Sequence, residues 1–197
     1  MYILNSNLTL FTNVGDISDA RVKSLKDVFG PHFPEVERPN EGVIIFKKES
    51  KALYVDSKQI TFIAKGNSED FSVEEATNYL KQIFEILSLS PKSGVGIKFE
   101  GIENTNDNTI EKSKTHTKDA VEILGAEGVG FRFIIQKQDF AGNVFIEPYI
   151  KDNQKIFYNI ELESRERVSH AQLDQLVETM FNQGTKDAED AARTLLY

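Results

Sequence analysis

The fold is decided by the stretch Ala52-Leu53-Tyr54-Val55-Asp56-Ser57-Lys58-Gln59-Ile60-Thr61-Phe62. Aromatic, β-branched and other apolar residues lie on both sides of Asp56-Ser57, which is typical of two strands joined by a tight turn. Ser72 follows, with Glu75 three residues later. This spacing is a capping box, in which each side chain satisfies a free backbone N–H at the start of a helix. The sequence therefore predicts a hairpin followed at once by a helix.

The rest of the first half extends this unit towards the N-terminus. Residues 2–11 predict a strand with Leu4, Leu8 and Leu10 on one face. Asp16 or Ser18 is a suitable N-cap for the helix that follows. In order, the predicted elements are a strand at 2–11, a helix carrying Val22, Leu25, Val28 and Phe29 and ended by Gly30-Pro31, a connection at 32–42, strands at 43–48, 51–55 and 59–65, and a helix from Ser72 to about Leu89.

The second half predicts nearly the same order of elements. They are a strand from Val95 to Gly101 or Ile102, a polar loop at 104–115, a short helix near 116–124 ended by Gly125, strands at 129–136, 143–150 and 155–163, a helix from Ser169 to about Gly184, and a final helix at 185–196. The second hairpin is predicted to be extended by residues 137–142. Differences of this kind fall in connections, which tolerate insertions.

Two sequence patterns recur between the halves. Asp27-Val28-Phe29-Gly30 returns as Glu122-Ile123-Leu124-Gly125. An apolar set at helical spacing also returns: Ala76, Tyr79, Leu80, Ile83 and Phe84 in the first half become Leu173, Leu176, Val177, Met180 and Phe181 in the second. A near-constant offset at two separate places indicates a duplicated unit. The alternative is that any two amphipathic helices can be aligned.

These patterns together predict an α+β fold. We expect two β-α-β-β-β-α repeats, at 1–92 and 93–184, that form one curved antiparallel sheet with helices packed on one face. A C-terminal helix at 185–197 has no counterpart in the first half. We expect the two repeats to form one compact domain, since each is small for an independent core.

The order of elements resembles the TATA-binding protein scaffold, in which two such repeats form a curved sheet with helices on its convex side. The hairpin at 52–62 and the helix after Ser72 look like part of one such repeat. The resemblance implies a scaffold, and fold alone does not carry function. The family is basic on its DNA-binding face and has Gly in the turn where this chain has Asp56-Ser57. Asn5 or Asn7 fits one of the family's paired central Asn residues, but residues 95–99 offer no second one.

Composition limits the classes of function. The chain has 197 residues and a formal net charge of −8, which disfavours a general nucleic-acid binder. It has no cysteine, so disulfides, thiolate metal sites and a cysteine nucleophile are excluded. Residues 1–7 lack the pattern of a signal peptide, and no apolar stretch reaches the length of a membrane span. We therefore expect a cytoplasmic protein with no membrane contact.

Strand parity predicts a mixed surface on the sheet face away from the helices. Apolar side chains fall there among charged ones, including Glu147 and Glu161. The candidate binding residues are Phe46, Ile63, Lys65, Arg132, Ile134, Phe145, Tyr149 and Phe157. A large apolar patch of this kind usually marks an interface. Two alternatives remain open: the strand registers differ from this interpretation, or the final helix and the 104–115 loop cover the face.

Catalytic and metal motifs are missing from the sequence. None of the three histidines, His32, His116 and His170, has a partner at metal-ligand spacing. Gly125 to Gly130 resembles a phosphate loop, but it follows a helix and opens a strand, whereas a phosphate loop does the reverse. Glu161, Glu163, Arg165 and Arg167 are interpreted as a solvated strand end with cross-strand ion pairs. We expect no catalytic residues, metal or cofactor.

Three functions are compatible with these observations. The favoured one is a non-catalytic interaction module whose sheet face or edge binds a protein partner or a second copy. The second is nucleic-acid binding through sheet aromatics and the first-half lysines, which are Lys47, Lys48, Lys51, Lys58 and Lys65. The third is an enzyme or small-ligand protein with a pocket near Arg132, Tyr149 and Glu161.

Overall fold

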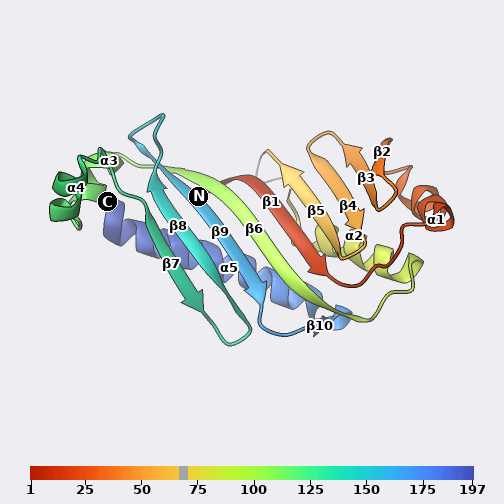
Figure 1. Ribbon diagram of the computed structural model, residues 1–197. Coiled ribbons are helices and arrows are strands. Elements are labelled where there is room, and N and C mark those ends of the chain that lie inside the picture. The colour runs from red at the N-terminus through yellow and green to blue at the C-terminus, as the bar shows by residue number, and fades with distance from the viewer. Residues whose placement is uncertain (67–70) are drawn as a thin grey trace.

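Figure 1 shows the computed structural model of the chain, which describes residues 1–66 and 71–197. Ten strands and five helices lie within these residues. The strands are β1 (Tyr2–Phe11), β2 (Glu35–Asn40), β3 (Val43–Lys48), β4 (Lys51–Asp56), β5 (Gln59–Lys65), β6 (Lys92–Asn104), β7 (Phe131–Gln136), β8 (Phe140–Pro148), β9 (Lys155–Ser164) and β10 (Val168–Ser169). The helices are α1 (Asp19–Phe29), α2 (Val73–Ile86), α3 (Thr109–Lys114), α4 (Lys118–Leu124) and α5 (His170–Leu196).

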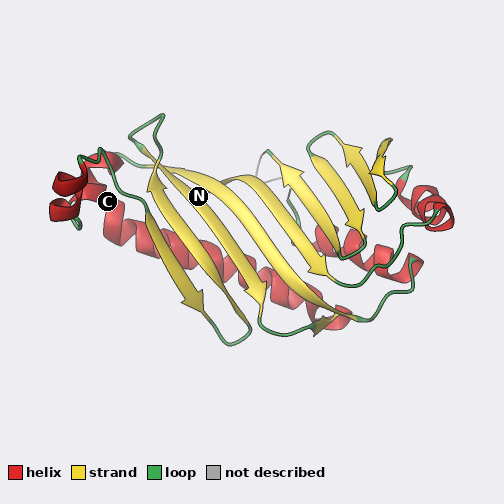
Figure 2. Ribbon diagram, in the orientation of Figure 1, coloured by secondary structure: helices red, strands yellow, loops and turns green. Residues whose placement is uncertain are grey.

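All the strands belong to one open antiparallel sheet. Its order is β2-β3-β4-β5-β1-β6-β9-β8-β7, and β10 pairs with β6 off this path. The middle of the sheet is the long β1–β6 pair, which joins the two halves of the chain (Figure 2). The prediction of an α+β fold with an antiparallel sheet is confirmed.

The helices α2 and α5 cover one face of this sheet (Figure 1). Alternate strand residues, such as Phe62 in β5 and Ile160 in β9, are fully buried beneath them. Leu80 of α2 and Val177 of α5 belong to the same continuous cluster of buried residues. One core therefore runs through both halves of the chain, because each element buries one apolar side against the other layer.

Local signals in the sequence begin and end several elements as expected. The Ser72 hydroxyl accepts a hydrogen bond from the Glu75 N–H at 3.3 Å, at the start of α2. Ser18 caps α1 in the same way. Gly125 ends α4 with φ at 62°, a left-handed conformation that a residue with a side chain rarely adopts.

The C-terminal helix differs from the prediction. No break occurs near Gly184, and α5 is one helix of 27 residues. A Cβ at Gly184 would lie 2.8 Å from Leu162 Cδ1, so glycine serves here to bring the helix close to β9. Ala188 and Ala192 continue the buried side of α5 beyond it. The prediction of a separate helix at 185–196 is therefore wrong. Glycine at position 184 allows close packing against β9 and does not end the helix.

Three predicted loops contain regular structure. The 32–42 connection holds β2, where Pro39 is tolerated because an edge strand need not donate every N–H. The 104–115 loop holds α3, whose N-cap Asn108 accepts from the Glu111 N–H at 3.2 Å. The predicted hairpin extension is shorter, because β8 already begins at Phe140, whose side chain is buried in the core.

The first strand contains an irregularity that shifts its faces. The register of β1 against β6 changes between Ile3 and Asn5. As a result Ile3 is buried with Leu8 and Leu10, whereas Leu4, which parity alone places with them, is only half-buried. Such a bulge adds one residue to a strand and reverses the faces on its far side.

Candidate binding surface on the open face of the sheet

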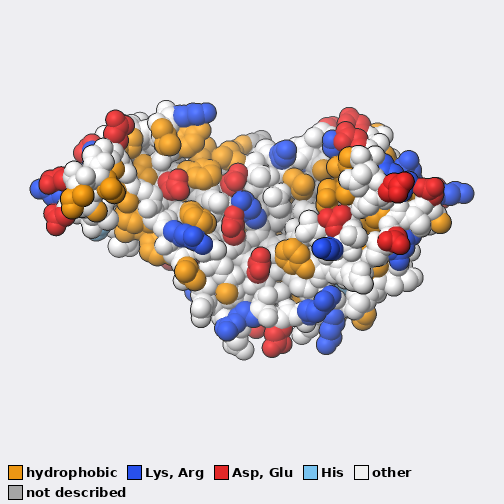
Figure 3. Space-filling model, in the orientation of Figure 1, with side chains coloured by type: hydrophobic (Ala, Val, Ile, Leu, Met, Phe, Trp, Pro, Cys, Tyr) orange, Lys and Arg blue, Asp and Glu red, His pale blue; other side chains and the backbone are white. Residues whose placement is uncertain are grey.

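The sheet face away from α2 and α5 is called here the open face (Figure 3). Charged side chains of both signs lie across its middle in this view, and apolar side chains gather on both sides. Its middle, the central strip, consists of side chains from four neighbouring strands. They are Asn5, Asn7, Thr9, Thr61, Lys98, Glu100, Asn159, Glu161 and Glu163.

Strand register aligns the central strip in rows. Asn7 lies opposite Ile63 of β5 on one side and Lys98 of β6 on the other. Lys98 in turn lies opposite Glu161 of β9 and donates to its Oε1 at 2.7 Å. This hydrogen bond lowers the pKa of the Glu161 carboxyl, and partial burial opposes the effect. The ammonium group of Lys98 is thus already engaged by an anion.

The central strip is rich in hydrogen-bond acceptors. The side-chain oxygens of Asn5, Asn7 and Asn159 are shielded from solvent and find no hydrogen-bond partner among the described residues. Most buried side-chain oxygens in proteins do have such a partner. Glu100 and Glu163 add carboxylates on the same face. The face therefore combines shielded amide oxygens with the carboxylates of Glu100 and Glu163.

A hollow of about 230 Å³ opens in the central strip. Its lining includes Phe11, Gly96 and Glu163. A Cβ at Gly96 would lie 2.9 Å from Phe11 Cε2, so the missing side chain lets the phenyl ring lie over β6. The hollow is smaller than the usual 300–1,000 Å³ of a small-molecule pocket. It suits one or two side chains of a partner better than a cofactor.

One predicted site residue lies on the wrong face. Phe46 is fully buried, and its ring centroid lies 5.7 Å from that of Phe29 in α1. It pairs across the sheet with Leu53, another core residue. The prediction that Phe46 belongs to the open face is wrong, because β3 is apolar on both faces and its parity is ambiguous from sequence.

Four predicted residues come together on the open face of β7, β8 and β9. Phe145 and Phe157 are half-buried, and Ile134 is 75% exposed. The guanidinium carbon of Arg132 lies 5.2 Å from the Phe145 ring centroid. Its Nη2 also donates to Asn143 Oδ1 at 3.0 Å. Arg132, Ile134, Phe145 and Phe157 form one apolar flank of the central strip.

The other predicted residues are separate from this flank. Ile63 and Lys65 lie on β5, on the far side of the central strip. Tyr149 lies just beyond the end of β8, where its N–H donates to the Lys155 carbonyl. Of Arg132, Tyr149 and Glu161, only Glu161 lines the hollow of the central strip.

The first-half lysines do not form one basic surface. Lys47 faces the open side and pairs with Glu37 at 2.7 Å. Lys51 faces α2 and pairs with Glu75 at 2.6 Å. The strand pleat thus sends neighbouring lysines to opposite faces, and two of them are neutralised by carboxylates. Lys47 and Lys51 are therefore not both available on one face to bind phosphate.

The remaining candidate chemistry is structural. Glu161 forms a cross-strand ion pair with Lys98, whereas Arg165 and Arg167 donate to the backbone carbonyls of Lys137 and Lys92. His170 packs edge-on against Phe84 with 4.1 Å between ring centroids. Burial is the main cause of a lowered pKa for His170. The nearby charge of Lys81 lowers this pKa further, whereas the charge of Glu85 raises it. In residues 1–66 and 71–197, no three His, Asp or Glu side chains come together as metal ligands would.

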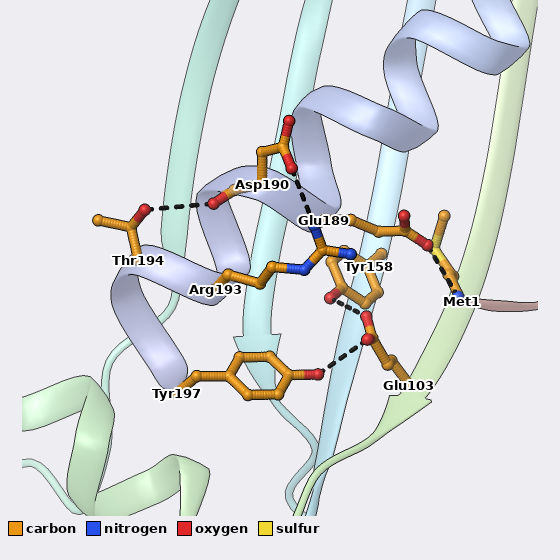
Figure 4. Close-up of polar contacts among 8 residues, drawn as sticks. All are labelled: Met1, Glu103, Tyr158, Glu189, Asp190, Arg193, Thr194 and Tyr197. Atoms are coloured by element: carbon orange, nitrogen blue, oxygen red, sulfur yellow. Dashed lines mark hydrogen bonds and ion pairs between the residues drawn. The ribbon is translucent and has the colours of Figure 1, made fainter.

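A partly buried polar cluster on the opposite side of the sheet was missed from sequence (Figure 4). Glu103 of β6 accepts hydrogen bonds from the hydroxyls of Tyr158 and Tyr197, at 2.7 and 2.8 Å. The amino group of Met1 pairs with Glu189 of α5 at 2.8 Å. The pKa of Tyr197 is raised to about 12. Burial is the larger cause, and the hydrogen bond to the Glu103 carboxylate is the next. No sequence motif links these residues, because they come from four separate elements.

Parity did contain a signal for the central strip. Asn5, Asn7, Thr9 and Phe11 alternate with the buried leucines of the first strand, so they share the opposite face. The sequence interpretation followed only the leucines. This alternation predicts a largely polar row on the open face of the first strand.

Comparison with known proteins adds little to this geometry. No family model matches the sequence, and no curated protein matches it either. A solved structure titled "Structure of crystal form I of TP0453" aligns with 90% of this chain and 94% of its own, at 8% identity and a TM-score of 0.17. A score that low supports no argument about fold or function. Among the described residues, no helix is both long and apolar enough to cross a membrane.

Proposed function

We propose that this protein is a non-catalytic interaction module whose open face binds a protein segment carrying basic and apolar side chains. One observation carries the proposal. The central strip presents acceptors and an excess of carboxylates, among them Glu100 and Glu163, next to an apolar flank. Complementary charges across an interface select the partner and exclude wrong ones. Buried apolar contacts then supply most of the affinity.

The charge of the central strip argues against nucleic acid at this surface. A phosphate backbone over the middle of the sheet would approach Glu100, Glu161 and Glu163, and Lys98 is already paired with Glu161. Like charges brought together at an interface cost several kcal/mol. A basic peptide is favoured instead, because its positive charges approach the carboxylates of Glu100 and Glu163. Protein is therefore the better supported partner.

We also propose that the scaffold is a duplicated unit of the TATA-binding protein type. Read outward from the central pair, one half of the sheet runs β1, β5, β4, β3, β2 and the other runs β6, β9, β8, β7. The two orders correspond strand for strand, except that β2 has no partner. The first helices differ, since Phe29 of α1 is buried whereas Leu124 of α4 is 77% exposed. Divergence of one copy accounts for this difference.

The function is tested with defined peptides and calorimetry. A peptide of alternating lysine and leucine should bind the wild-type protein, and its counterpart of alternating glutamate and leucine should not. Replacing Glu100 and Glu163 together by Gln should weaken binding of the basic peptide by about tenfold or more. Glu178→Gln is the matched control, because this residue is exposed on α5, on the other side of the sheet.

Two results would contradict the proposed function. Equal weakening by Glu178→Gln would mean that net charge attracts the peptide and that the central strip does not. Tight binding of duplex DNA at low salt, lost in a Lys65→Gln variant but kept in the Glu100 and Glu163 variant, would favour nucleic acid instead. Heat-unfolding curves of each variant establish that the fold is retained.

A further inference from the structure

The two edges of the sheet differ in their protection against pairing with another strand. The β2 edge carries the charged residues Glu35, Glu37 and Arg38, followed by Pro39. The register of β2 against β3 is also irregular. Charges, proline and bulges at an edge are the usual means of preventing such pairing. The β2 edge is therefore closed to a further strand.

The β7 edge has none of these features. Its sequence is Phe131-Arg132-Phe133-Ile134-Ile135-Gln136, without an acidic residue or proline. The only charged side chain, Arg132, leans over Phe145 on β8 and is bound to Asn143, away from the free edge. Within the described parts of the chain β7 pairs with β8 alone, and no strand lies beyond it in Figure 2. An exposed apolar edge of this kind is a template for strand pairing.

The hydrogen-bond pattern identifies which backbone groups are free. The Lys137 N–H donates to the Phe140 carbonyl at 2.8 Å in the turn between β7 and β8. Hydrogen-bonded and non-hydrogen-bonded pairs alternate along an antiparallel ladder. Counting back from Lys137, the N–H and C=O groups of Gln136, Ile134 and Arg132 point to the free edge.

We propose that this edge pairs antiparallel with β7 of a second copy, with the two-fold axis at Ile134. In this register Ile134 faces its own counterpart, and Arg132 of each copy faces Gln136 of the other. All three free residues of β7 then form hydrogen-bonded pairs, with about six bonds in total. The two sheets become one continuous sheet. This interface lies at an edge and is independent of the proposed peptide site in the central strip.

Self-complementarity is the reason for assigning a second copy and not another protein. The register places Phe133 opposite Ile135 on the helix side of the sheet and Ile134 opposite Ile134 on the open face. Apolar side chains meet on both faces, and no like charges lie directly opposite. Two-fold symmetric interfaces require one surface to complement itself in this way. The 75% exposure of Ile134 and the 37% exposure of Phe133 leave apolar area for the contact.

Sedimentation equilibrium over a wide range of protein concentration tests the proposal. The wild-type mass should rise with concentration from 22.3 kDa to twice that value. Ile134→Lys and Ile134→Glu should each raise the dissociation constant by about tenfold or more, because like charges then face each other across the axis. Ile123→Lys is the matched control, since Ile123 is 83% exposed on α4 and the chemical change is the same.

Mixing the two Ile134 variants tests the register itself. Lys and Glu then face each other, so the mixture should form a heterodimer more tightly than either variant forms a homodimer. A register centred on another residue gives no such rescue.

A wild-type protein that stays monomeric at every concentration would overturn the proposal, as would Ile134 variants that dimerise as well as Ile123→Lys. Hydrogen exchange of β7 in the wild type, free of any mutational effect on folding, should slow as concentration rises; unchanged exchange would also overturn it.

Discussion

The hydroxyl of Tyr158 lies 2.7 Å from Glu103 Oε2, beneath the C-terminal turns of α5 (Figure 4). Tyr197 donates to the other oxygen of the same carboxylate. One carboxylate thereby connects β6, β9 and the end of the longest helix. Tyr158 is fully buried, so its hydroxyl has no access to water in place of Glu103.

Tyr158→Phe should lower the free energy of unfolding by about 1.5–3 kcal/mol, the usual value of a hydrogen bond to a charged group. The ring stays in place, so packing is preserved and only the hydroxyl is lost. Tyr197→Phe should cost less, because Tyr197 is partly exposed and water can replace its hydroxyl. Urea unfolding of both variants measures the difference. Equal costs would show that burial of the hydroxyl is unimportant.

High pH should weaken the same cluster. The pKa of Tyr197 is raised to about 12 and that of Tyr158 is raised further, in both cases first by burial and then by Glu103. The unfolded chain loses these protons near pH 10, before the folded chain does. Their stabilising contribution is therefore complete below pH 10 and declines as the pH rises towards 12. A Tyr158→Phe, Tyr197→Phe double variant should show a flatter decline of unfolding free energy over this range.

Low pH should act through His170. Burial and Lys81 hold the pKa of this imidazole below its ordinary value of 6.5, so the folded protein favours the neutral form. The unfolded chain binds the proton more readily, and stability falls as the pH drops below about 6.5. His170→Phe, which keeps a ring against Phe84, should reduce the loss of melting temperature between pH 7 and pH 5. An unchanged loss would place the acid sensitivity in other groups.

Substitutions at Gly184 should separate helix propensity from packing. Alanine improves the helix by about 1 kcal/mol, and its Cβ meets only the terminal methyl of Leu162, so Gly184→Ala should be nearly neutral. Gly184→Val adds methyl groups against Leu162 and Ile160, and overpacking of this kind costs about 1–3 kcal/mol. Thermal unfolding of the two variants distinguishes this account from a helix end at Gly184, where both substitutions would destabilise through backbone strain.

The two faces of the sheet should respond differently to loss of an aromatic ring. Phe46→Ala empties a fully buried position and should cost about 3–5 kcal/mol. Phe145→Ser removes a half-buried ring from the open face and should cost about 1 kcal/mol or less. Chemical unfolding of both variants provides the comparison. A large cost for Phe145→Ser would mean that this ring stabilises the sheet and is not free for a partner.

Local signals in the sequence predicted most of the elements. The Ser72 cap, the Gly125 helix end and the hairpin around Asp56-Ser57 each depend on interactions within a few residues, so they can be recognised without a tertiary structure. Gly184 could not be interpreted correctly, because the reason for the glycine is the nearby strand β9, which is distant in the sequence.

The candidate surface was predictable only in part. Alternation in β7, β8 and β9 places Ile134, Phe145 and Phe157 on one face, as the structure does. The face of Phe46 was predicted wrongly because both faces of β3 are apolar. Alternation then does not show which face is buried. The central strip required the order of the strands, since nothing in the sequence near Asn7 indicates that Lys98 lies beside it.

The position of β1 at the middle of the sheet has a consequence for synthesis on the ribosome. Its first neighbour, β5, ends at Lys65, and its second neighbour, β6, begins only at Lys92. At 5–20 residues per second, β1 therefore waits roughly one to five seconds with one side paired and the other bare. The nascent chain passes through a stage in which its most central strand is temporarily an outermost one. Chaperone contact during elongation should peak in that interval.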